Sequence, residues 1–378
     1  MSTDISAGAS AIVIGAGIVG AACALELADA GFAVTVVDAG PVGGGATAAG
    51  MGHVVVMDDS PAQLALTRYS QQLWTQLQTV LPPQAEIMRC GTIWVAADAE
   101  EMAEVERKRH RYLEEQIPCD VLDAGRLYQL EPNLRPGLAG GLLIQQDSVV
   151  YPPTIAAWML DRVTEKGGTV RTHTQVDRVE PHCVILSNGD RLAGDVIVNA
   201  AGAVAPRLTP GLHIKQRKGH LIITDRYPNF VRHQLVELGY LKSAHQSDGD
   251  SVAFNVQPRP SGQLLIGSSR QYDESRAVDH VIVAKMVARA IEYMPAIAEL
   301  SATRVWTGFR AATPDKLPLI GPSPANDGLW LAAGHEGLGI TTSLATARLL
   351  VDQIMGRTSA IPVAPYLPSR AASEAMHV

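Results

Sequence analysis

Cysteine is scarce in this 378-residue chain, which has four in all. They are far apart and lie in or beside apolar runs, at Cys23, Cys90, Cys119 and Cys183. This spacing is typical neither of a disulfide framework nor of a metal site. We therefore expect no structural metal.

Positive charge is also in short supply. The 31 lysines and arginines are outnumbered by 38 aspartates and glutamates, which gives a formal net charge of −7. A surface that binds nucleic acid needs a basic patch, and the sequence has no basic tract that would supply one. We expect no nucleic-acid partner.

Long apolar runs are missing too. No run approaches the roughly 18 residues that a membrane-spanning helix requires. The residues before Ser10 have neither the positive charge nor the apolar core of a signal peptide. We expect a cytoplasmic protein without a transmembrane segment, and association with the surface of the inner membrane stays open.

What the sequence does have is enough apolar residues for a sizeable core, at 47% against 18% charged. At 378 residues the chain exceeds the usual limit for a single core, so we expect two domains. The glycine-rich turns and the β-branched runs then indicate the fold class.

The first apolar run leads directly into a glycine-rich turn. Residues 11–14 predict a buried strand, and a helix that ends at Gly31 follows it. Between the two stand Gly15, Gly17 and Gly20, with G-x-G-x-x-G spacing. In a dinucleotide fold these glycines permit the sharp turn, admit a pyrophosphate and let the helix pack on the strand, respectively. An ordinary tight turn is the alternative.

A second β-branched run, residues 34–37, ends on Asp38. An acid at this place accepts hydrogen bonds from ribose hydroxyls and disfavours a 2′-phosphate, so we do not expect NADP. The amino terminus of the preceding helix offers unpaired N–H groups and a positive dipole end to phosphates. The motif thus predicts a dinucleotide cofactor.

Three further segments are rich in glycine and other small residues. They are residues 40–53, residues 199–203 at the end of a predicted strand, and residues 334–341 before a helix. Backbone without large side chains lets a flat ligand or another backbone come very close. A flexible linker is the alternative for the first segment, but residues 54–56 directly after it look buried.

The expected elements alternate between two patterns along the chain. Strand–helix units occupy residues 1–81, 146–217 and 310–378. Alternating strands with few helices, typical of an antiparallel sheet, dominate residues 82–145 and 218–309. We predict an α/β dinucleotide-binding domain interleaved with an α+β substrate domain.

Two further helices are expected. Residues 100–116 are highly charged and predict a helix that faces solvent. Residues 343–355 predict the helix that follows the last glycine-rich turn.

Together these segments resemble the D-amino-acid oxidase superfamily of flavoproteins, which includes glycine oxidase, sarcosine oxidase and D-amino-acid dehydrogenases. The resemblance covers nearly the whole chain. Four segments carry it: residues 15–20 with Asp38, residues 47–52, residues 199–202, and Gly308-Phe309-Arg310 through Thr341. It implies FAD as cofactor, in a Rossmann-like domain of the glutathione-reductase type that the substrate domain interrupts twice.

The resemblance also implies which residues contact FAD. Val176 reaches the adenine half, residues 47–52 line the isoalloxazine ring, and the turn 334–340 faces the pyrimidine side, where the helix dipole favours the anionic reduced flavin. The full predicted set is Gly15, Gly17, Ile18, Val19, Gly20, Asp38, Ala39, Thr47, Ala48, Ala49, Gly50, Met51, Gly52, Val176, Ala200, Ala201, Gly202, Arg310, Gly334, His335, Glu336, Gly337, Leu338, Gly339, Ile340 and Thr341. Outward-pointing side chains are the alternative for His335 and Glu336.

By the same resemblance, Arg310 stands where the family holds the substrate carboxylate. A planar guanidinium matches a carboxylate with two parallel hydrogen bonds, which would fix the Cα–H over the flavin. A surface salt bridge is the alternative, which the flanking Phe309 disfavours. His53 is predicted to touch the ring or substrate, or else to be structural, and Tyr240 and Tyr272 are candidates for the substrate wall.

Two departures from family patterns bear on how the flavin is attached and on which electron acceptor is used. Ala311 and Ala312 stand where sarcosine oxidases carry the cysteine that bonds the flavin, so we expect non-covalent FAD. Residues 264–266 lack the lysine that helps oxygen react in those oxidases, which favours a dehydrogenase. Its electron acceptor would be a quinone, a dye or a partner subunit.

The whole pattern is most similar to the bacterial D-hydroxyproline dehydrogenase branch. This implies hydride transfer from Cα of an amino acid to flavin N5, with cis-4-hydroxy-D-proline as the substrate and a pyrroline carboxylate as the product. The alternatives are a glycine, sarcosine or D-amino-acid oxidase that makes H2O2, a flavin-carrying β-subunit of an opine or hydroxyproline dehydrogenase, and a plain NAD-binding module. A homo-oligomer stays open as well.

Overall fold

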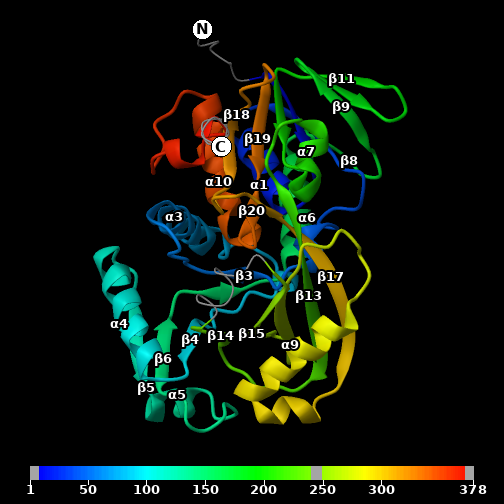
Figure 1. The fold of residues 1–378 in the computed structure, drawn as a ribbon. Coiled ribbons are helices and arrows are strands. Elements are labelled where there is room, and N and C mark those ends of the chain that lie inside the picture. Colours follow the sequence, from blue (N-terminus) through cyan, green and yellow to red (C-terminus); the bar gives the residue numbers. More distant parts are fainter. Residues whose placement is uncertain (1–7, 240–248, 371–378) are drawn as a thin grey trace.

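The computed structural model describes residues 8–239 and 249–370, which form two large β-sheets with helices packed around them (Figure 1). A six-stranded sheet lies in the upper part of this view and a nine-stranded sheet in the lower part. The earliest and latest helices of the chain, coloured blue and orange-red, lie side by side in the upper part. Separate stretches of the chain therefore contribute to each of the two sheets.

The six-stranded sheet runs in the order β18-β19-β12-β1-β2-β8 and is parallel except for its edge pair β18–β19. Its strands are β1 (Ser10–Ile14), β2 (Ala33–Val37), β8 (Thr169–Arg171), β12 (Val196–Asn199), β18 (Leu319–Pro322) and β19 (Leu329–Ala333). Ile14 pairs with Val37 on one side and with Asn199 on the other. The carboxyl ends of three strands thus meet where the glycine motif and Asp38 follow, which is where such sheets bind ligands.

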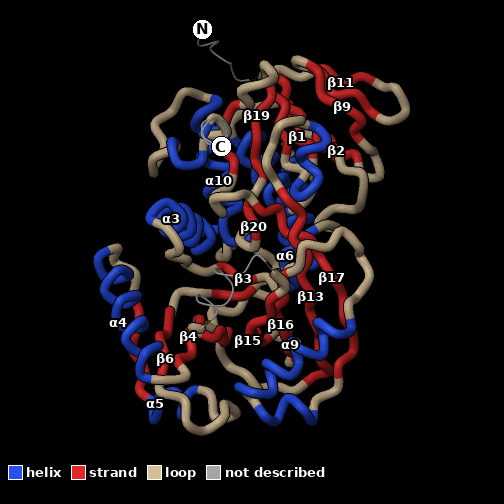
Figure 2. Tube along the Cα trace, viewed as in Figure 1, coloured by secondary structure: helices blue, strands red, loops and turns tan. Residues whose placement is uncertain are grey.

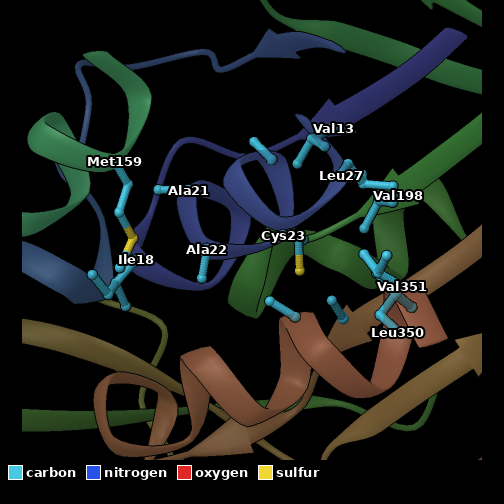
Figure 3. Close-up of a cluster of buried hydrophobic side chains, with 14 of the residues drawn as sticks. Val13, Ile18, Ala21, Ala22, Cys23, Leu27, Met159, Val198, Leu350 and Val351 are labelled. Atoms are coloured by element: carbon cyan, nitrogen blue, oxygen red, sulfur yellow. The ribbon is translucent and has the colours of Figure 1, made fainter. Parts of the chain in front are cut away.

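Four helices cover one face of this sheet. They are α1 (Ile18–Asp29), α3 (Pro61–Leu77), α6 (Pro152–Glu165) and α10 (Gly339–Ile354). Figure 3 shows the core they share, in which Ala22 and Cys23 of α1 lie between Met159 of α6 and Val351 of α10. The small side chains of α1 let all three helices pack closely. Burial, with Glu26 nearby, raises the pKa of the Cys23 thiol, which stays protonated.

The opposite face carries a small sheet and a short helix. The sheet has the order β11-β10-β9, formed by β9 (Val176–Glu180), β10 (Cys183–Leu186) and β11 (Arg191–Ala193), and the helix is α7 (Ala205–Leu208). Strands β9 and β10 pair antiparallel as a hairpin.

The nine-stranded sheet runs β20-β17-β13-β16-β15-β14-β4-β6-β5 and is antiparallel except for the pair β14–β4. Its strands are β4 (Thr92–Ala96), β5 (Cys119–Asp123), β6 (Gly140–Ile144), β13 (Lys215–Arg226), β14 (Gln234–Glu237), β15 (Ser251–Pro258), β16 (Gln263–Arg270), β17 (Ala302–Ala312) and β20 (His335–Glu336). Figure 2 shows the helices of this part on the outside of the strands: α4 (Ala99–Glu114), α5 (Ala124–Leu130) and α9 (His280–Tyr293). Helix α9 packs on β15 and β16, over a core that includes Phe254 and Met286.

Two short elements lie at the junction of the parts. Helix α2 (Ala46–Ala49) contacts β17, and the pair of β3 (His53–Val54) with β7 (Ser148–Val149) follows it. Helix α2 lies in the glycine-rich segment after Asp38 and β3 begins at its end, so this segment is ordered against its surroundings and the linker alternative is wrong.

The predicted fold class is confirmed: a parallel α/β unit is interleaved with a larger, mostly antiparallel sheet. The predicted domain boundaries at 217/218 and 309/310 fall inside β13 and β17, and these boundaries stay a prediction. Two predicted helices differ in detail. Helix α10 begins at Gly339, four residues before the predicted start, and Thr342 already donates its N–H to Leu338 O.

Helix α4 corrects the expectation of a fully solvent-facing helix. Val105, Lys108 and Tyr112 on its inner side are buried. The Lys108 ammonium contacts the buried Asp58 carboxylate, which also accepts hydrogen bonds from Arg111 at 2.9 Å and from the Tyr112 hydroxyl at 3.2 Å. One of the charged residues of this helix, Lys108, is therefore part of a buried ion pair and does not face solvent.

Candidate functional site

A cavity of about 1300 Å³ lies where the two sheets meet. Residues from every glycine-rich segment predicted to face a ligand contribute to its lining. The predicted site residues that line it are Gly15, Gly17, Ile18, Val19, Asp38, Ala39, Thr47, Ala48, Ala49, Gly50, Met51, His53, Val176, Ala200, Ala201, Gly202, Arg310, His335, Glu336, Gly337, Leu338, Gly339 and Ile340. Segments separated by more than three hundred residues therefore meet around one space.

The first glycine turn has the geometry that the motif predicts. Gly15 has a φ of +114°, and a Cβ there would lie 2.5 Å from the carbonyl oxygen of Ala200. A Cβ on Gly20 would lie 1.9 Å from the Gly15 oxygen, so Gly20 lets α1 pack on the turn and does not line the cavity. Only glycine fits at either position.

Two side chains organise the amino terminus of α1. The Asp38 carboxylate accepts backbone N–H bonds from Ala16 at 2.6 Å and from Gly40 at 2.7 Å. The Thr47 hydroxyl accepts the N–H of Ile18 at 2.9 Å, which links the glycine-rich segment to the helix. A carboxylate has lone pairs for further donors, so Asp38 can still accept ribose hydroxyls.

The segment after α2 is held against the nine-stranded sheet. Trp306 donates its indole N–H to Ala49 O at 3.3 Å, and Gln257 donates to Met51 O at 2.7 Å. A Cβ on Gly308 would lie 2.4 Å from that of Ala49, so β17 and α2 are in close contact. Met51 packs with Leu221, Leu265, Ile223 and Trp306 in a small apolar cluster. This cluster forms an apolar wall of the cavity.

Arg310 lies on β17 and lines the cavity. Its Nη1 donates to Ser269 O at 3.0 Å, and the guanidinium lies over Gly219, where a Cβ would come within 2.6 Å of it. Gly337 borders its other side. The same nitrogen, Nη1, lies 3.5 Å from Lys218 O. Two backbone carbonyls and two glycines thus fix a half-buried cation at the cavity wall, which contradicts the surface salt-bridge alternative.

His53 lines the cavity beside Arg310 and is uncharged at neutral pH. Burial, together with the Arg310 charge, lowers the pKa of His53 to about 4. Its Nδ1 has no hydrogen-bond partner among the described residues. Its carbonyl oxygen accepts the Thr341 hydroxyl at 3.1 Å, so Thr341 positions this strand from behind the lining.

His335 and Glu336 point inward, which corrects the outward alternative. His335 is 7% exposed, bonds through Nε2 to the Thr346 hydroxyl at 3.0 Å, and has a pKa lowered to about 4 by burial. Glu336 has a φ of +50°, and its Oε2 accepts the N–H of Gly337 at 2.5 Å. Burial alone would raise the pKa of Glu336, but the Arg270, Arg310 and Arg217 charges lower it, so Glu336 is ionised.

Arg217 and Arg270 line the cavity and were missed by the sequence prediction. Both are buried, at 7% and 8% exposure. Arg217 stands in the run Lys215 to Lys218, which looks like an ordinary basic surface in the sequence. Side chains alternate between the two faces of a strand, so Arg217 lies on the same face of β13 as Leu221, which also lines the cavity. This alternation could have indicated that Arg217 faces inward.

The remaining predicted residues lie outside the lining. A Cβ on Gly52 would lie 2.0 Å from Val150 O, and one on Gly334 would lie 2.6 Å from Thr313 Cγ2, so both serve close packing. Tyr272 is 52% exposed and stacks on the Arg217 guanidinium at 5.3 Å, which corrects its prediction as a wall residue. Tyr240 lies outside the described residues.

The cavity fits FAD. Its volume exceeds the roughly 300–1000 Å³ of an ordinary small-molecule pocket, and its lining runs from Asp38 and Val176 to Arg310 and Trp306. The glycine turn and the amino terminus of α1 suit a pyrophosphate between these ends. No cysteine lines the cavity in the described part of the chain.

A sequence model described as FAD dependent oxidoreductase (DAO) matches residues 10–353. The chain belongs to this family. Its cofactor is accordingly FAD, and it is an oxidoreductase. The family membership agrees with the interleaved fold and with the cavity that the glycine-rich segments build.

Among relatives, the chain is 30% identical to glycine oxidase of Pseudomonas aeruginosa, over 95% of this chain and 98% of that protein. The structure of glycine oxidase from Geobacillus kaustophilus superposes with a TM-score of 0.85 and 26% identity, covering 96% of this chain and 98% of that one. L-proline dehydrogenase from P. horikoshii shares the fold, with a TM-score of 0.86, 21% identity, and coverage of 98% and 99%. The chain is thus similar to glycine oxidases along its full length.

Two features are absent from residues 8–239 and 249–370. None of the helices there is both long and apolar enough to cross a membrane. No group of three or more histidine, cysteine, aspartate or glutamate side chains there is placed to hold a metal ion.

Proposed function

We propose that this protein oxidises the Cα–N bond of an α-amino or α-imino acid. Bound FAD supplies the hydride acceptor for such a reaction. The observation that carries the proposal is the placement of Arg310, a fixed cation on β17 that faces the cavity beside the Met51 segment. An arginine held this rigidly is suited to bind a carboxylate with two parallel hydrogen bonds.

The residues around Arg310 supply orientation and exclude water. A carboxylate on Arg310 leaves the rest of a small substrate against the apolar wall of Met51, Leu221 and Leu265. This wall cannot hydrogen-bond water, so it favours an uncharged amine over an ammonium. Positioning of this kind accounts for much of the rate in reactions that need no side-chain base.

His53 is suited to act as a neutral hydrogen-bonding group. Because burial and Arg310 lower its pKa to about 4, it adds no second positive charge beside the carboxylate site. Its buried Nδ1, which has no partner among the described residues, is available to a ligand in the cavity.

For the electron acceptor, we propose a quinone, a dye or a partner subunit in place of oxygen. Strand β16 (Gln263–Arg270) contains no lysine, and the neighbouring Lys218 is tied to Asp273 at 2.7 Å. The ammonium of Lys218 is therefore held by Asp273 and is not free to approach the apolar wall. FAD is held without a covalent bond, since Ala311 and Ala312 stand after Arg310.

The specific substrate that we propose to test first is cis-4-hydroxy-D-proline, following the sequence resemblance. The pyrrolidine ring of this compound can pack on the apolar wall of Met51, Leu221 and Leu265. Its single carboxylate can be bound by Arg310 without a second cation. Conversion to a pyrroline carboxylate with dye reduction supports this choice. Turnover of D-alanine or glycine without turnover of D-proline analogues would contradict it.

An oxidase is the second candidate, favoured by the 30% identity to a glycine oxidase. Peroxide formed in air in a one-to-one ratio with product supports the oxidase. Dye reduction without peroxide supports the dehydrogenase. An isolated chain whose bound FAD is bleached by the amino acid, but which reduces neither acceptor, supports the third possibility, a subunit that needs a partner.

Replacement of Arg310 tests the carboxylate role. We expect Arg310→Leu to lower kcat/KM by about 100-fold, since it removes a charged hydrogen-bonding pair worth roughly 3 kcal/mol. Arg276→Leu is the matched control, because Arg276 also borders the cavity but is exposed. Bound FAD, read from the visible spectrum, should stay equal in both variants. Equal loss of activity in both would contradict the assignment.

A further inference from the structure

Arg217 is a buried cation that lines the cavity, and the proposed reaction assigns it no role. Its side chain is about nine-tenths buried, yet its Nε has no hydrogen-bond partner among the described residues. Its contact with Glu336 Oε1 is long, at 3.6 Å, and that oxygen has no hydrogen-bond partner there either. A buried guanidinium with unused donors costs stability unless a ligand satisfies it.

The strand register directs Arg217 to the same space as Arg310. The two residues are direct partners in the antiparallel pair β13–β17, so their side chains leave the sheet on the same face. Residues opposite each other in such a pair have Cβ atoms about 5 Å apart. Their guanidinium groups can therefore bind two carboxylates of one small molecule.

Several positive charges lie near Glu336. Three guanidinium groups, those of Arg217, Arg270 and Arg310, act on the single Glu336 carboxylate. If Arg310 binds the α-carboxylate of the substrate, the carboxylate that remains near Arg217 among the described residues is that of Glu336, at 3.6 Å. Buried charge of one sign is stable only when an opposite charge joins it.

We propose that Arg217, with Arg270 and Glu336 beside it, forms a second anion-binding subsite, so that the preferred substrates are amino acids with two carboxylates. This inference rests on the proposed oxidation of an amino acid and narrows its substrate. The second carboxylate is carried on the side chain or on the nitrogen. Cis-4-hydroxy-D-proline, with one carboxylate, leaves the subsite unused.

The experiment compares matched substrate pairs with a dye as acceptor. One pair is sarcosine and iminodiacetate, and the other is D-alanine and D-aspartate. Each pair differs by an added carboxylate, so the ratio of kcat/KM within a pair reports the second subsite. We expect the wild-type enzyme to prefer the dicarboxylate in at least one pair by about tenfold or more.

Arg217→Gln should lower that ratio by about 10- to 100-fold, mainly through KM of the dicarboxylate, as expected for a hydrogen bond to a charged group. Arg304→Gln is the control, because Arg304 lies on β17 and borders the cavity but is exposed. It should leave the ratio unchanged. If Arg217→Gln fails to fold, Arg217→Lys keeps the charge and should retain part of the preference.

The outcomes separate this inference from the proposed function. If the monocarboxylates or cis-4-hydroxy-D-proline are oxidised and the dicarboxylates are not preferred, the second subsite is contradicted and the function stands. An unchanged ratio in Arg217→Gln, with a shifted flavin reduction potential, would also contradict it, because Arg217 would then serve the cofactor. If none of these compounds is oxidised by the FAD-loaded protein, the proposed function itself fails.

Discussion

At the residue scale, burial decides which groups around the cavity carry charge. His53 and His335 have pKa values lowered to about 4, first of all by burial, and are neutral at pH 7. The arginines keep their charge because a guanidinium does not lose its proton in proteins. The positive charges of the cavity wall therefore belong to arginines and not to His53 or His335.

The pH dependence of stability follows from His335, which is 7% exposed. Its pKa is about 4 in the folded chain against 6.5 for an ordinary histidine. Between these values the unfolded chain binds more protons, so the stability that this group contributes is complete above pH 6.5 and falls as the pH is lowered. We expect His335→Gln to reduce the loss of stability between pH 7 and pH 5 by about 2 kcal/mol.

Urea unfolding of the wild type and of His335→Gln at both pH values measures this difference. The amide of glutamine can keep the bond to Thr346, so the two proteins should be comparable at pH 7. The same acid-induced loss in both would show that His335 does not titrate in this range.

At the element scale, the turn between β1 and α1 depends on backbone contacts that only glycine permits. A Cβ on Gly20 would meet the Gly15 oxygen at 1.9 Å, whereas one on Gly45 would meet no atom within 4 Å. We expect Gly20→Ala to lose FAD binding and about 1–3 kcal/mol or more of stability, from overpacking. Gly45→Ala should keep both, although Gly45 lines the cavity.

Flavin content per chain, from the visible spectrum, and the thermal unfolding midpoint measure these effects. Full FAD content in Gly20→Ala would mean that the turn can rearrange without cost. A loss in Gly45→Ala as well would point to general sensitivity of the glycine-rich segments.

The attachment of α4 rests on a buried ion pair. Lys108 is 2% exposed and contacts the Asp58 carboxylate, with Trp94 4.9 Å from the ammonium. We expect Asp58→Leu to cost about 3–5 kcal/mol, because it leaves the Lys108 ammonium buried without this partner. The double variant Asp58→Leu with Lys108→Met should recover most of the loss.

Chemical unfolding of the two variants tests this. A double variant as unstable as Asp58→Leu would show that the contacts of Asp58 with Arg111 and Tyr112, and not the pair with Lys108, stabilise this region.

Elements with a strong local pattern could be predicted from the sequence. The strand at 11–14, the helix after it and the strand ending before Asp38 are found where the pattern places them. The early start of α10 could not be predicted, because this helix packs against α3, which is far away in the sequence. The buried side of α4 could not be predicted either, because Lys108 pairs with Asp58, fifty residues earlier. Arg217 was missed for a similar reason: its burial depends on the pairing of β13 with β17.

At the scale of the whole molecule, the cavity exists because the chain passes repeatedly between the two sheets. The glycine motif and Asp38 belong to the six-stranded sheet, whereas Arg310 belongs to the nine-stranded one. The sequence could predict which segments face the cofactor, since these are glycine-rich. Which side chains meet across the junction follows only from the relative placement of the sheets.

An anaerobic spectral titration shows whether this family member uses its FAD to oxidise an amino acid. The purified chain is mixed with cis-4-hydroxy-D-proline, its L-epimer, and the two matched pairs of mono- and dicarboxylates, while the flavin absorbance is recorded. We expect bleaching by at least one of these compounds and slow recovery in air. A yellow protein that none of them bleaches, or a colourless protein that takes up no FAD, would contradict the account.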